Sequence, residues 1–378
     1  MIRAPHQECE SYALTVAITL LTFSGEKMRL SSLFTATMLA AAVALTGCDD
    51  STAQTDSANT LKIEHAQGAT SVAPSPQKVI VLNPATLDNM DALQIPVAGV
   101  PKNSTHLPAF LAKYQGEAYL NAGTLFEPDY EAISNAKPDL IVAGGRAHDA
   151  YDKLSAIAPT IALDVDTKNF TQSLTQRVTQ LGDIFGKQQE AKALNDAFMA
   201  KSAALREKAA SAGSAMVIMV SGGKMSAYTP GSRFGFIFDQ LGFKPAAAFT
   251  ETGKHGNVVT SEFIMNTDPD WLFVLDRDSA IGRAEGASAQ QVLDNALIHK
   301  TKAWQNQHIV YLDSSSLYIA GGIQSYTRLM DNINSVLNDA SATQASTHAA
   351  MQSAEDTQES AAADREDDNA IPDSAKSE

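Results

Sequence analysis

The sequence predicts an α/β protein of two lobes, each with a central and mainly parallel sheet, joined by one long bridging helix. Two blocks of short apolar segments alternate with amphipathic stretches, which is typical of parallel sheets covered by helices on both faces. A long stretch of good helix formers without a strand pattern separates the blocks. The region 61–338 is also longer than one hydrophobic core usually serves, so two lobes are the expected organisation.

The first lobe is predicted at residues 61–186. Apolar runs at 78–83, 140–145 and 160–164 are rich in Val, Ile and Leu, and they end in turn residues. Because these runs are apolar throughout, they indicate short strands that are buried on both faces of a sheet.

The bridging helix is predicted at residues 187–212. The region 170–212 is rich in Ala, Gln, Lys, Glu and Leu, and Gly186 and Lys187 indicate a break between two helices. A helix of ~25 residues would be about 40 Å long at 1.5 Å per residue, enough to run from one lobe to the other. We therefore expect a rigid connection that limits closing motions.

The second lobe is predicted at residues 213–338, with strand-like runs at 217–222, 271–276 and 309–313. Polar segments flank the two lobes. Residues 48–60 form a Ser/Thr/Asp/Ala tether, and residues 339–378 form an acidic tail. Both segments have too few apolar residues to form a core, so we expect them to be disordered.

Residues 1–47 are predicted to contain a signal peptide. A basic start at Met28 precedes an apolar run at 33–45, which is too short to be a membrane-spanning helix. A start at Met28 would also explain the second apolar run before it. The sequence Leu45-Thr46-Gly47-Cys48 resembles the lipobox of bacterial lipoproteins, which predicts a lipid anchor on Cys48. The alternative is an ordinary signal peptide followed by a chance cysteine.

The next residue, Asp49, resembles the signal that keeps lipoproteins on the inner membrane. The expected location is therefore the periplasm, with a lipid anchor in the inner membrane. Cys9 lies before Met28, so the mature chain is expected to contain no disulfide and no cysteine metal site.

The charge of the chain argues against one class of partner. The formal net charge is −15 at pH 7, which disfavours nucleic acid as a ligand. Much of the excess lies in the flanking segments, where the tether carries −3 and residues 352–378 of the acidic tail carry −7.

Five side chains with binding chemistry lie in loops or after predicted strands. Because ligands of open α/β sheets bind outside the carboxyl ends of the strands, such residues can converge on one cleft. Each also has a simpler interpretation, such as a solvated charge, a solvent-facing imidazole or a packed tyrosine. The five are Arg146, Arg233, His255, Arg277 and Tyr318.

Several motifs together resemble the iron-siderophore-binding proteins of bacterial ABC importers, in particular the catecholate subgroup with enterobactin- and petrobactin-type ligands. The motifs lie at residues 123–129, 145–146 with 151–154, 226–228, 231–235 and 275–277. The resemblance covers 61–338 and implies the helical-backbone substrate-binding-protein fold. It also implies a monomer without enzymatic activity that delivers its cargo to an inner-membrane ABC permease.

The resemblance also implies roles for individual residues. It places Arg146, Arg233 and Arg277 around the anionic ferric complex, with Tyr228 as a further ligand contact. It places His255 and Tyr318 on the iron itself, where they would fill positions that the siderophore leaves open. A complex of three catecholates carries about three negative charges, and arginine stays ionised even in a partly dry cleft. Fe(III) would arrive with its chelate, and no intrinsic cofactor is expected.

Family members commonly present one acidic residue on each lobe to the permease. The resemblance implies Glu127 and Glu262 for this role. The alternative is that both are solvated carboxylates at helix starts, where the helix dipole favours negative charge.

Other functions stay open at the level of sequence. A receptor for bare zinc or manganese would share the two-lobe plan, but the histidines are scattered. A haem or corrinoid receptor is a related alternative. A serine hydrolase would use Ser232 or Ser261 with His255 and Asp276, but no Gly-x-Ser-x-Gly motif is present.

Overall fold

The computed structural model describes residues 60–249, 253, 255–283 and 285–341. The predicted signal peptide, Met28, Cys48, nearly all of the tether and nearly all of the acidic tail lie outside these residues. Within the described part of the chain, no helix is both long and apolar enough to cross a bilayer.

The first lobe contains a five-stranded sheet in which all neighbouring strands are parallel. A separate antiparallel hairpin, β1 (Leu61–His65) and β2 (Gly68–Val72), precedes it. The sheet has the order β5 (Leu120–Asn121), β4 (Gly99–Val100), β3 (Val79–Val81), β6 (Leu140–Ala143) and β7 (Thr160–Ala162). The helices are α1 (Pro84–Ala92), η2 (Ala109–Gln115), α2 (Tyr130–Ala136), η3 (Gly145–Ala150) and α3 (Tyr151–Ser155).

The second lobe contains a mixed sheet. Strand β12 is parallel to both of its neighbours, whereas β9 and β11 are antiparallel additions at one edge. The order is β11 (Asn257–Val259), β9 (Lys224–Tyr228), β8 (Ser214–Ser221), β12 (Trp271–Asp276) and β13 (Ile309–Tyr311), with β10 (Lys244–Pro245) also on β8. The helices are α6 (Phe236–Asp239), α7 (Ser261–Thr267), α8 (Arg277–Ala280), α9 (Ala289–Leu293), η4 (Ile298–Lys300), α10 (Lys302–Gln305) and the π-helix η5 (Ser316–Ala320).

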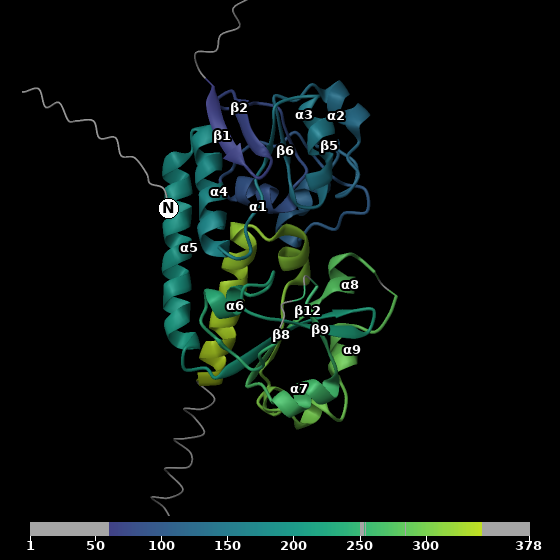
Figure 1. Ribbon diagram of the computed structural model, residues 1–378, viewed down its shortest axis with the longest axis vertical. Helices are drawn as coiled ribbons and strands as arrows, with labels where there is room; N and C mark the ends of the chain where they lie inside the picture. The colour runs from purple at the N-terminus through teal and green to yellow at the C-terminus, as the bar shows by residue number, and fades with distance from the viewer. Residues whose placement is uncertain (1–59, 250–252, 254, 284, 342–378) are drawn as a thin grey trace, which may run out of the picture. The chain divides into compact units, whose positions relative to one another are not determined.

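Two helices lie between the lobes in the sequence, α4 (Phe170–Phe185) and α5 (Gln188–Ala209). Gly186 ends α4 in the left-handed conformation, with φ of 67°, which glycine adopts without strain. Helix α5 has 22 residues and is about 33 Å long at 1.5 Å per residue. It runs beside elements of both lobes (Figure 1), which confirms the predicted bridging helix.

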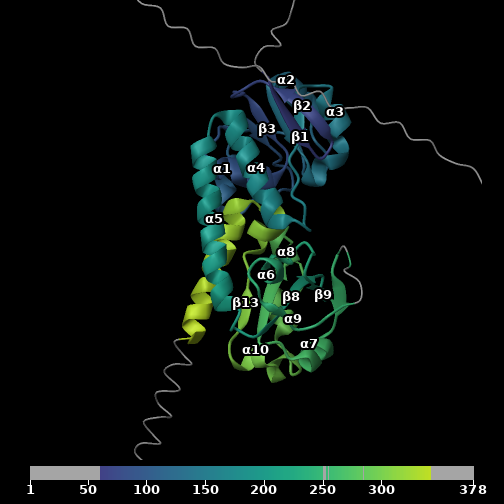
Figure 2. The same ribbon diagram turned by 60° about the vertical axis from the view of Figure 1, so that its left-hand side comes forward.

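The last described helix, 323–341, provides a second connection. It lies beside α5 in both ribbon views (Figure 2). Lys201 of α5 contacts Asp331 at 2.5 Å, and Lys208 donates to Asn334 at 2.7 Å. These contacts are exposed and contribute little energy singly, but they align the two helices along the same side.

A buried carboxylate of the first lobe holds the start of helix 323–341. Asp88 of α1 accepts N–H groups from Gly322, Gln324 and Ser325 at 2.8–3.2 Å, and the Ser325 hydroxyl at 2.6 Å. Burial raises the pKa of Asp88 to about 6, although these hydrogen bonds act in the opposite direction. The first lobe therefore caps a helix that follows the second lobe's last strand.

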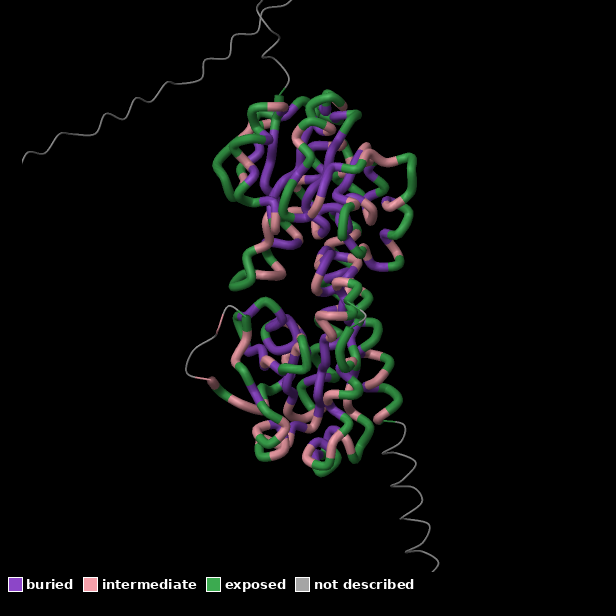
Figure 3. Tube along the Cα trace, turned by 90° about the vertical axis from the view of Figure 1, so that its right-hand side faces the viewer, coloured by how far each residue is buried: buried purple, intermediate pink, exposed green. Residues whose placement is uncertain are grey.

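The apolar core is continuous through the molecule. One buried cluster includes Val81 of the first lobe, Phe198 of α5 and Phe273 of the second lobe, while two smaller clusters each belong to one lobe. The central strands of both sheets are almost wholly buried, and buried residues run through the interior of both lobes (Figure 3). Because close-packed interiors resist deformation, this core restricts relative motion of the lobes.

The two lobes share a repeated unit around their central strands. Helices α2 and α7 each end at a residue in the left-handed conformation, Lys137 with φ of 49° and Asp268 with φ of 48°. A proline and an aspartate follow in both cases. Asp139 and Asp270 each accept a backbone N–H at the start of the neighbouring parallel strand, at 2.8 Å. The same local design thus begins β6 and β12.

Candidate ligand-binding site

Three arginines surround one tyrosine. Arg146 and Arg233 both donate to the backbone carbonyl of Tyr318, at 2.8 and 2.6 Å. Arg277 donates through Nε to the Tyr318 hydroxyl at 2.9 Å. The three guanidinium carbons lie 5.3, 4.5 and 5.6 Å from the centre of the tyrosine ring, in the same order. We call these four residues the arginine–tyrosine cluster.

The cluster combines residues from both lobes. Arg146 lies in η3 directly after β6, and Arg277 is the first residue of α8 after β12. In the repeated unit they are equivalent, because each follows its Pro-Asp pair by the same number of residues. Arg233 lies in the turn between β9 and α6. Tyr318 lies in η5, a π-helix, which is a rare element that is frequent at functional sites.

The nearest carboxylates leave the arginines largely uncompensated. Asp276 is engaged in capping, because it accepts the backbone N–H groups of Ser279 and Ala289 at 3.0 and 2.8 Å. Among the described residues, only Asp278 forms an ion pair with an arginine of the cluster, at 3.8 Å from Arg277. The interpretation of Arg277 as a simple partner of its neighbours is therefore poorly supported.

The electrostatics of the cluster favour an anionic ligand. Burial and the positive charge of Arg233 lower the pKa of Arg146. Burial tends to raise the pKa of Tyr318, but the hydrogen bond from Arg277 and the positive charges of all three arginines outweigh it and lower the pKa. Like charges gathered in a partly buried site repel one another, so a bound anion relieves that repulsion.

Tyr228 and His255 lie beside the cluster in a different arrangement. Tyr228 is buried, packs edge-on against Phe234 at 4.8 Å, and donates its hydroxyl to the backbone carbonyl of His255 at 3.2 Å. The His255 side chain is exposed. In the part of the chain that the structure describes, no residue forms a hydrogen bond or ion pair with its imidazole. Tyr228 therefore holds the loop that carries His255, and the imidazole is not joined to the cluster.

The described residues contain no group of three or more His, Cys, Asp or Glu side chains that could hold a metal ion. Tyr318 and His255 can offer at most one oxygen and one nitrogen ligand. A ferric ion held here would need its other ligands from a chelator, since carboxylates do not converge on this position.

The two predicted docking carboxylates are exposed. Glu262 lies in the first turn of α7, whose N-cap is Thr260. Glu127 lies in a turn, where its N–H donates to the Thr124 hydroxyl at 2.8 Å. In the repeated unit, the equivalent of Glu262 is Glu131, which is also exposed, in the first turn of α2.

The hydrolase candidates do not form a nucleophile–base pair. The Ser232 hydroxyl is buried and donates to the Thr229 carbonyl at 2.5 Å. Ser261 accepts from Asn295 at 3.2 Å. Neither hydroxyl contacts His255 among the described residues, whereas nucleophilic catalysis requires a base within hydrogen-bond reach.

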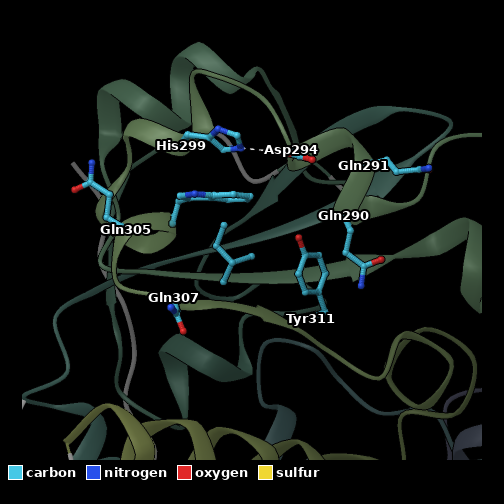
Figure 4. Close-up of a pocket in the computed structure, with 9 residues that line it drawn as sticks. Gln290, Gln291, Asp294, His299, Gln305, Gln307 and Tyr311 are labelled. Carbon is cyan, nitrogen blue, oxygen red and sulfur yellow. Dashed lines mark hydrogen bonds and ion pairs between the residues drawn. The ribbon is translucent and has the colours of Figure 1, made fainter. Parts of the chain in front are cut away.

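A cavity of about 890 Å³ lies elsewhere in the second lobe (Figure 4). His299 and Asp294 pair across its upper side at 2.8 Å, and Tyr311 lies on its lower side. It contains no arginine or lysine and none of the predicted site residues, so it does not suit an anionic complex. Its lining is Gln290, Gln291, Asp294, His299, Trp304, Gln305, Gln307, Ile309 and Tyr311.

Three supporting residues were not predicted from the sequence. Ser221 accepts from Arg277 at 3.3 Å, Phe234 lies under Arg233 at 5.1 Å, and Asp164 accepts the N–H of Gly145 beside Arg146 at 2.5 Å. Asp164 and Ser221 both follow apolar strand-like runs, which was an available signal. Their partners depend on which strands are neighbours, and the sequence pattern does not supply that.

Comparison with known proteins identifies the family. The family model described as "Periplasmic binding protein" matches residues 79–316. The petrobactin-binding protein YclQ of Bacillus subtilis is 36% identical over 307 residues, which is 78% of this chain and 95% of that protein. The ferric-anguibactin-binding protein FatB of Vibrio anguillarum is 34% identical over 308 residues, 77% of this chain and 93% of that protein.

Solved structures agree in fold. The crystal structure of YclQ has a TM-score of 0.71 at 35% identity and covers 74% of this chain and 99% of its own. The catecholate-siderophore-binding protein VctP of Vibrio cholerae has a TM-score of 0.69 at 33% identity, covering 73% and 100%. The predicted fold class and the resemblance to siderophore-binding proteins are thereby confirmed. The chain belongs to the periplasmic binding protein family.

Proposed function

We propose that this chain binds a ferric catecholate siderophore at the arginine–tyrosine cluster and delivers it to an inner-membrane ABC permease for iron uptake. One observation carries the proposal: three arginines from two lobes converge on one tyrosine with a single distant carboxylate partner. The names of the relatives, which bind petrobactin and ferric anguibactin, support the same class of ligand.

The guanidinium groups are suited to this ligand. Arg146 and Arg233 already hold one neutral oxygen, the Tyr318 carbonyl. Catecholate oxygens carry negative charge, and hydrogen bonds from arginine to charged oxygen are about twice as strong as neutral ones. A ferric catecholate can therefore replace the carbonyl as hydrogen-bond acceptor, while the arginines keep their charge.

Tyr318 and His255 are proposed as direct iron ligands for a chelate that leaves positions open. The lowered pKa of Tyr318 favours the phenolate, which is the form that binds Fe(III). His255 would reach the same iron from the loop that Tyr228 holds. The iron is cargo brought by the chelate, and we propose neither a resident cofactor nor an enzymatic activity.

A receptor for bare zinc or manganese, or for haem or a corrinoid, remains the alternative function. The absence of a three-ligand group among the described side chains gives the bare-metal alternative little support. Three converging arginines match a compact anion of several charges better than the two propionates of haem.

Delivery requires contact with a permease and a place at the membrane. We propose that Cys48 carries a lipid anchor in the inner membrane and that Glu262 contacts the permease from the second lobe. For the first lobe the proposed residue is Glu127, and the repeated unit adds Glu131 as a competitor. Transport assays of Glu127→Ala, Glu131→Ala and Glu262→Ala decide between them. Unchanged iron uptake in all three, with normal siderophore binding, would reject the docking role.

The first test of the function is a fluorescence-quenching titration of residues 61–341. The ligands are ferric bis-catecholate, ferric tris-catecholate, ferric hydroxamate and Zn²⁺. We expect tight binding of a catecholate complex and a loss of affinity in Arg146→Ala, Arg233→Ala and Arg277→Ala. Binding of Zn²⁺ alone would establish the bare-metal alternative, and equal binding of hydroxamate and catecholate would reject the ligand class.

A further inference from the structure

The turn that carries Arg146 is held by one carboxylate. Asp164 accepts the N–H of Gly145 on its Oδ1 at 2.5 Å, and its Oδ2 lies 3.5 Å from Nδ1 of His148. Gly145 precedes Arg146 and His148 follows it in the same short helix, η3. The carboxylate therefore contacts this turn on both sides of the arginine.

The approach of Asp164 to the turn depends on glycine. Gly144 has φ of 108°, a conformation that other residues rarely adopt. A Cβ atom at this position would lie 2.6 Å from Oδ1 of Asp164 and 3.1 Å from Nδ2 of Asn83. The turn and the carboxylate thus fit together only because the side chain is absent.

Asp164 is itself fixed by neighbouring elements. It follows β7, the strand beside β6. Its backbone carbonyl accepts a hydrogen bond from Nε of Arg177, in α4, at 2.9 Å. On the other side of the turn, Nε2 of Gln67, between β1 and β2, lies 2.8 Å from Nε2 of His148. The turn is held between the hairpin and the carboxylate, while Arg146 extends from it to the Tyr318 carbonyl.

We propose that Asp164 is a positioning residue for Arg146, which sets the reach of this arginine from the first lobe to the ligand. The proposal rests on the proposed function. The positioning role and simple charge attraction predict opposite effects of removing Asp164 on the affinity for the ligand. Removal of a nearby negative charge would strengthen the binding of an anion, whereas loss of the positioning contact would weaken it.

The test compares affinities for ferric tris-catecholate in five proteins besides the wild type. We expect Asp164→Ala to weaken binding about tenfold, the scale of one charge-assisted hydrogen bond. Asp164→Asn keeps an acceptor for the Gly145 N–H and is expected to retain most of the affinity. Arg146→Ala should weaken binding at least as much as Asp164→Ala. The double variant Arg146→Ala/Asp164→Ala should bind like Arg146→Ala. The matched control is Asp166→Ala, which removes an exposed neighbouring carboxylate.

The double variant separates positioning from general damage. If Asp164 acts through Arg146, its substitution changes nothing once Arg146 is gone. Additive losses would overturn the proposal, as would unchanged or tighter binding in Asp164→Ala. Gly144→Ala provides a second route, because its Cβ would displace an intact Asp164. It should reproduce the loss if Asp164→Ala fails to fold.

A readout without ligand keeps the inference separate from the proposed function. Hydrogen exchange of residues 145–150 should accelerate in Asp164→Ala and stay unchanged in Asp166→Ala. The crystal structure of unliganded Asp164→Ala should show Arg146 beyond hydrogen-bond distance of the Tyr318 carbonyl. An intact Arg146–Tyr318 contact would overturn the positioning role even if no catecholate binds to the wild type. Failure of the wild type to bind any ferric catecholate would instead reject the proposed function.

Discussion

Asp88 provides a stability prediction with a sign and a magnitude. Its fully buried carboxylate has a pKa of about 6, raised from 3.8 mainly by burial. At 1.36 kcal/mol per pH unit, this difference corresponds to about 3 kcal/mol. Between these two pH values the folded protein binds more protons than the unfolded chain. The free energy of unfolding therefore falls by up to about 3 kcal/mol as pH rises from 3.8 to 6, and this contribution is constant above pH 6.

The substitution Asp88→Asn tests this reasoning. An amide oxygen can still face Gly322 and Ser325, but the amide nitrogen then faces the N–H of Gln324, which loses its acceptor. A buried donor left without a partner costs about 1–3 kcal/mol. We therefore expect Asp88→Asn to be less stable than the wild type by that amount near pH 3.8, where Asp88 is protonated in the folded protein, and to lose the dependence on pH between 3.8 and 6 that Asp88 causes. The deficit of Asp88→Asn should shrink as pH rises to 7, because only the wild type loses about 3 kcal/mol over this range.

Urea unfolding monitored by circular dichroism, at a series of pH values, measures both effects. The difference between the wild type and Asp88→Asn isolates the contribution of this carboxylate from those of the other acidic residues. Asp91→Asn is a suitable control, because Asp91 lies on the same helix but is only partly buried, with a lowered pKa. The free energy of unfolding of the wild type, relative to that of Asp88→Asn, should fall as pH rises from 3.8 to 6. A relative free energy that rises over this range, or that does not change with pH, would refute the assignment.

Two further predictions concern the site, and a third concerns the contact between α1 and the start of helix 323–341. Arg277→Leu removes the hydrogen bond and the largest charge effect on Tyr318, so the pKa of Tyr318 should rise, as measured by tyrosinate absorbance against a Tyr318→Phe control. Tyr228→Phe loses the hydrogen bond to the His255 carbonyl, worth about 0.5–1.5 kcal/mol. In fluorescence titrations it should weaken the binding of ferric bis-catecholate more than that of ferric tris-catecholate. Equal losses of affinity for the two complexes would exclude a role through His255. Gly322→Ala would place a Cβ 2.5 Å from the Ala85 carbonyl, so it should lower the thermal unfolding midpoint, and an unchanged midpoint would show that this interface can yield.

The central parallel strands could be predicted from the sequence, whereas the sheet edges could not. Strands β3, β6, β8 and β12 are buried on both faces, so their apolar runs stand out. Strands β4, β5 and β10 have two residues each, too few for any periodicity. Strand β9 begins with an exposed lysine and is recognisable only through its antiparallel pairing with β8.

The site residues that follow central strands could be predicted from the sequence, because those strands have recognisable apolar runs. Arg146 and Arg277 directly follow central strands of two different sheets, so the rule for α/β sheets places each of them at the carboxyl edge of its own sheet. The meeting of Arg146 and Arg233 on the carbonyl of Tyr318 was not predictable, because a backbone acceptor has no sequence signature. The same holds for the π-helix that presents this carbonyl.

The rigidity of the frame determines how such a site can respond to its ligand. Helix α5, helix 323–341 and the core cluster that runs through both lobes oppose large closing motions. The arginines must nevertheless release Tyr318 in order to hold a ligand oxygen. Four of the five residues of η5 are buried, and Leu317 and Ala320 belong to the same core cluster, so the groups free to move are the side chains of the arginine–tyrosine cluster. We expect free and loaded crystal structures to differ in the three guanidiniums, with the two sheets unmoved relative to each other, because on the proposed function the anion replaces the Tyr318 carbonyl as the acceptor for Arg146 and Arg233.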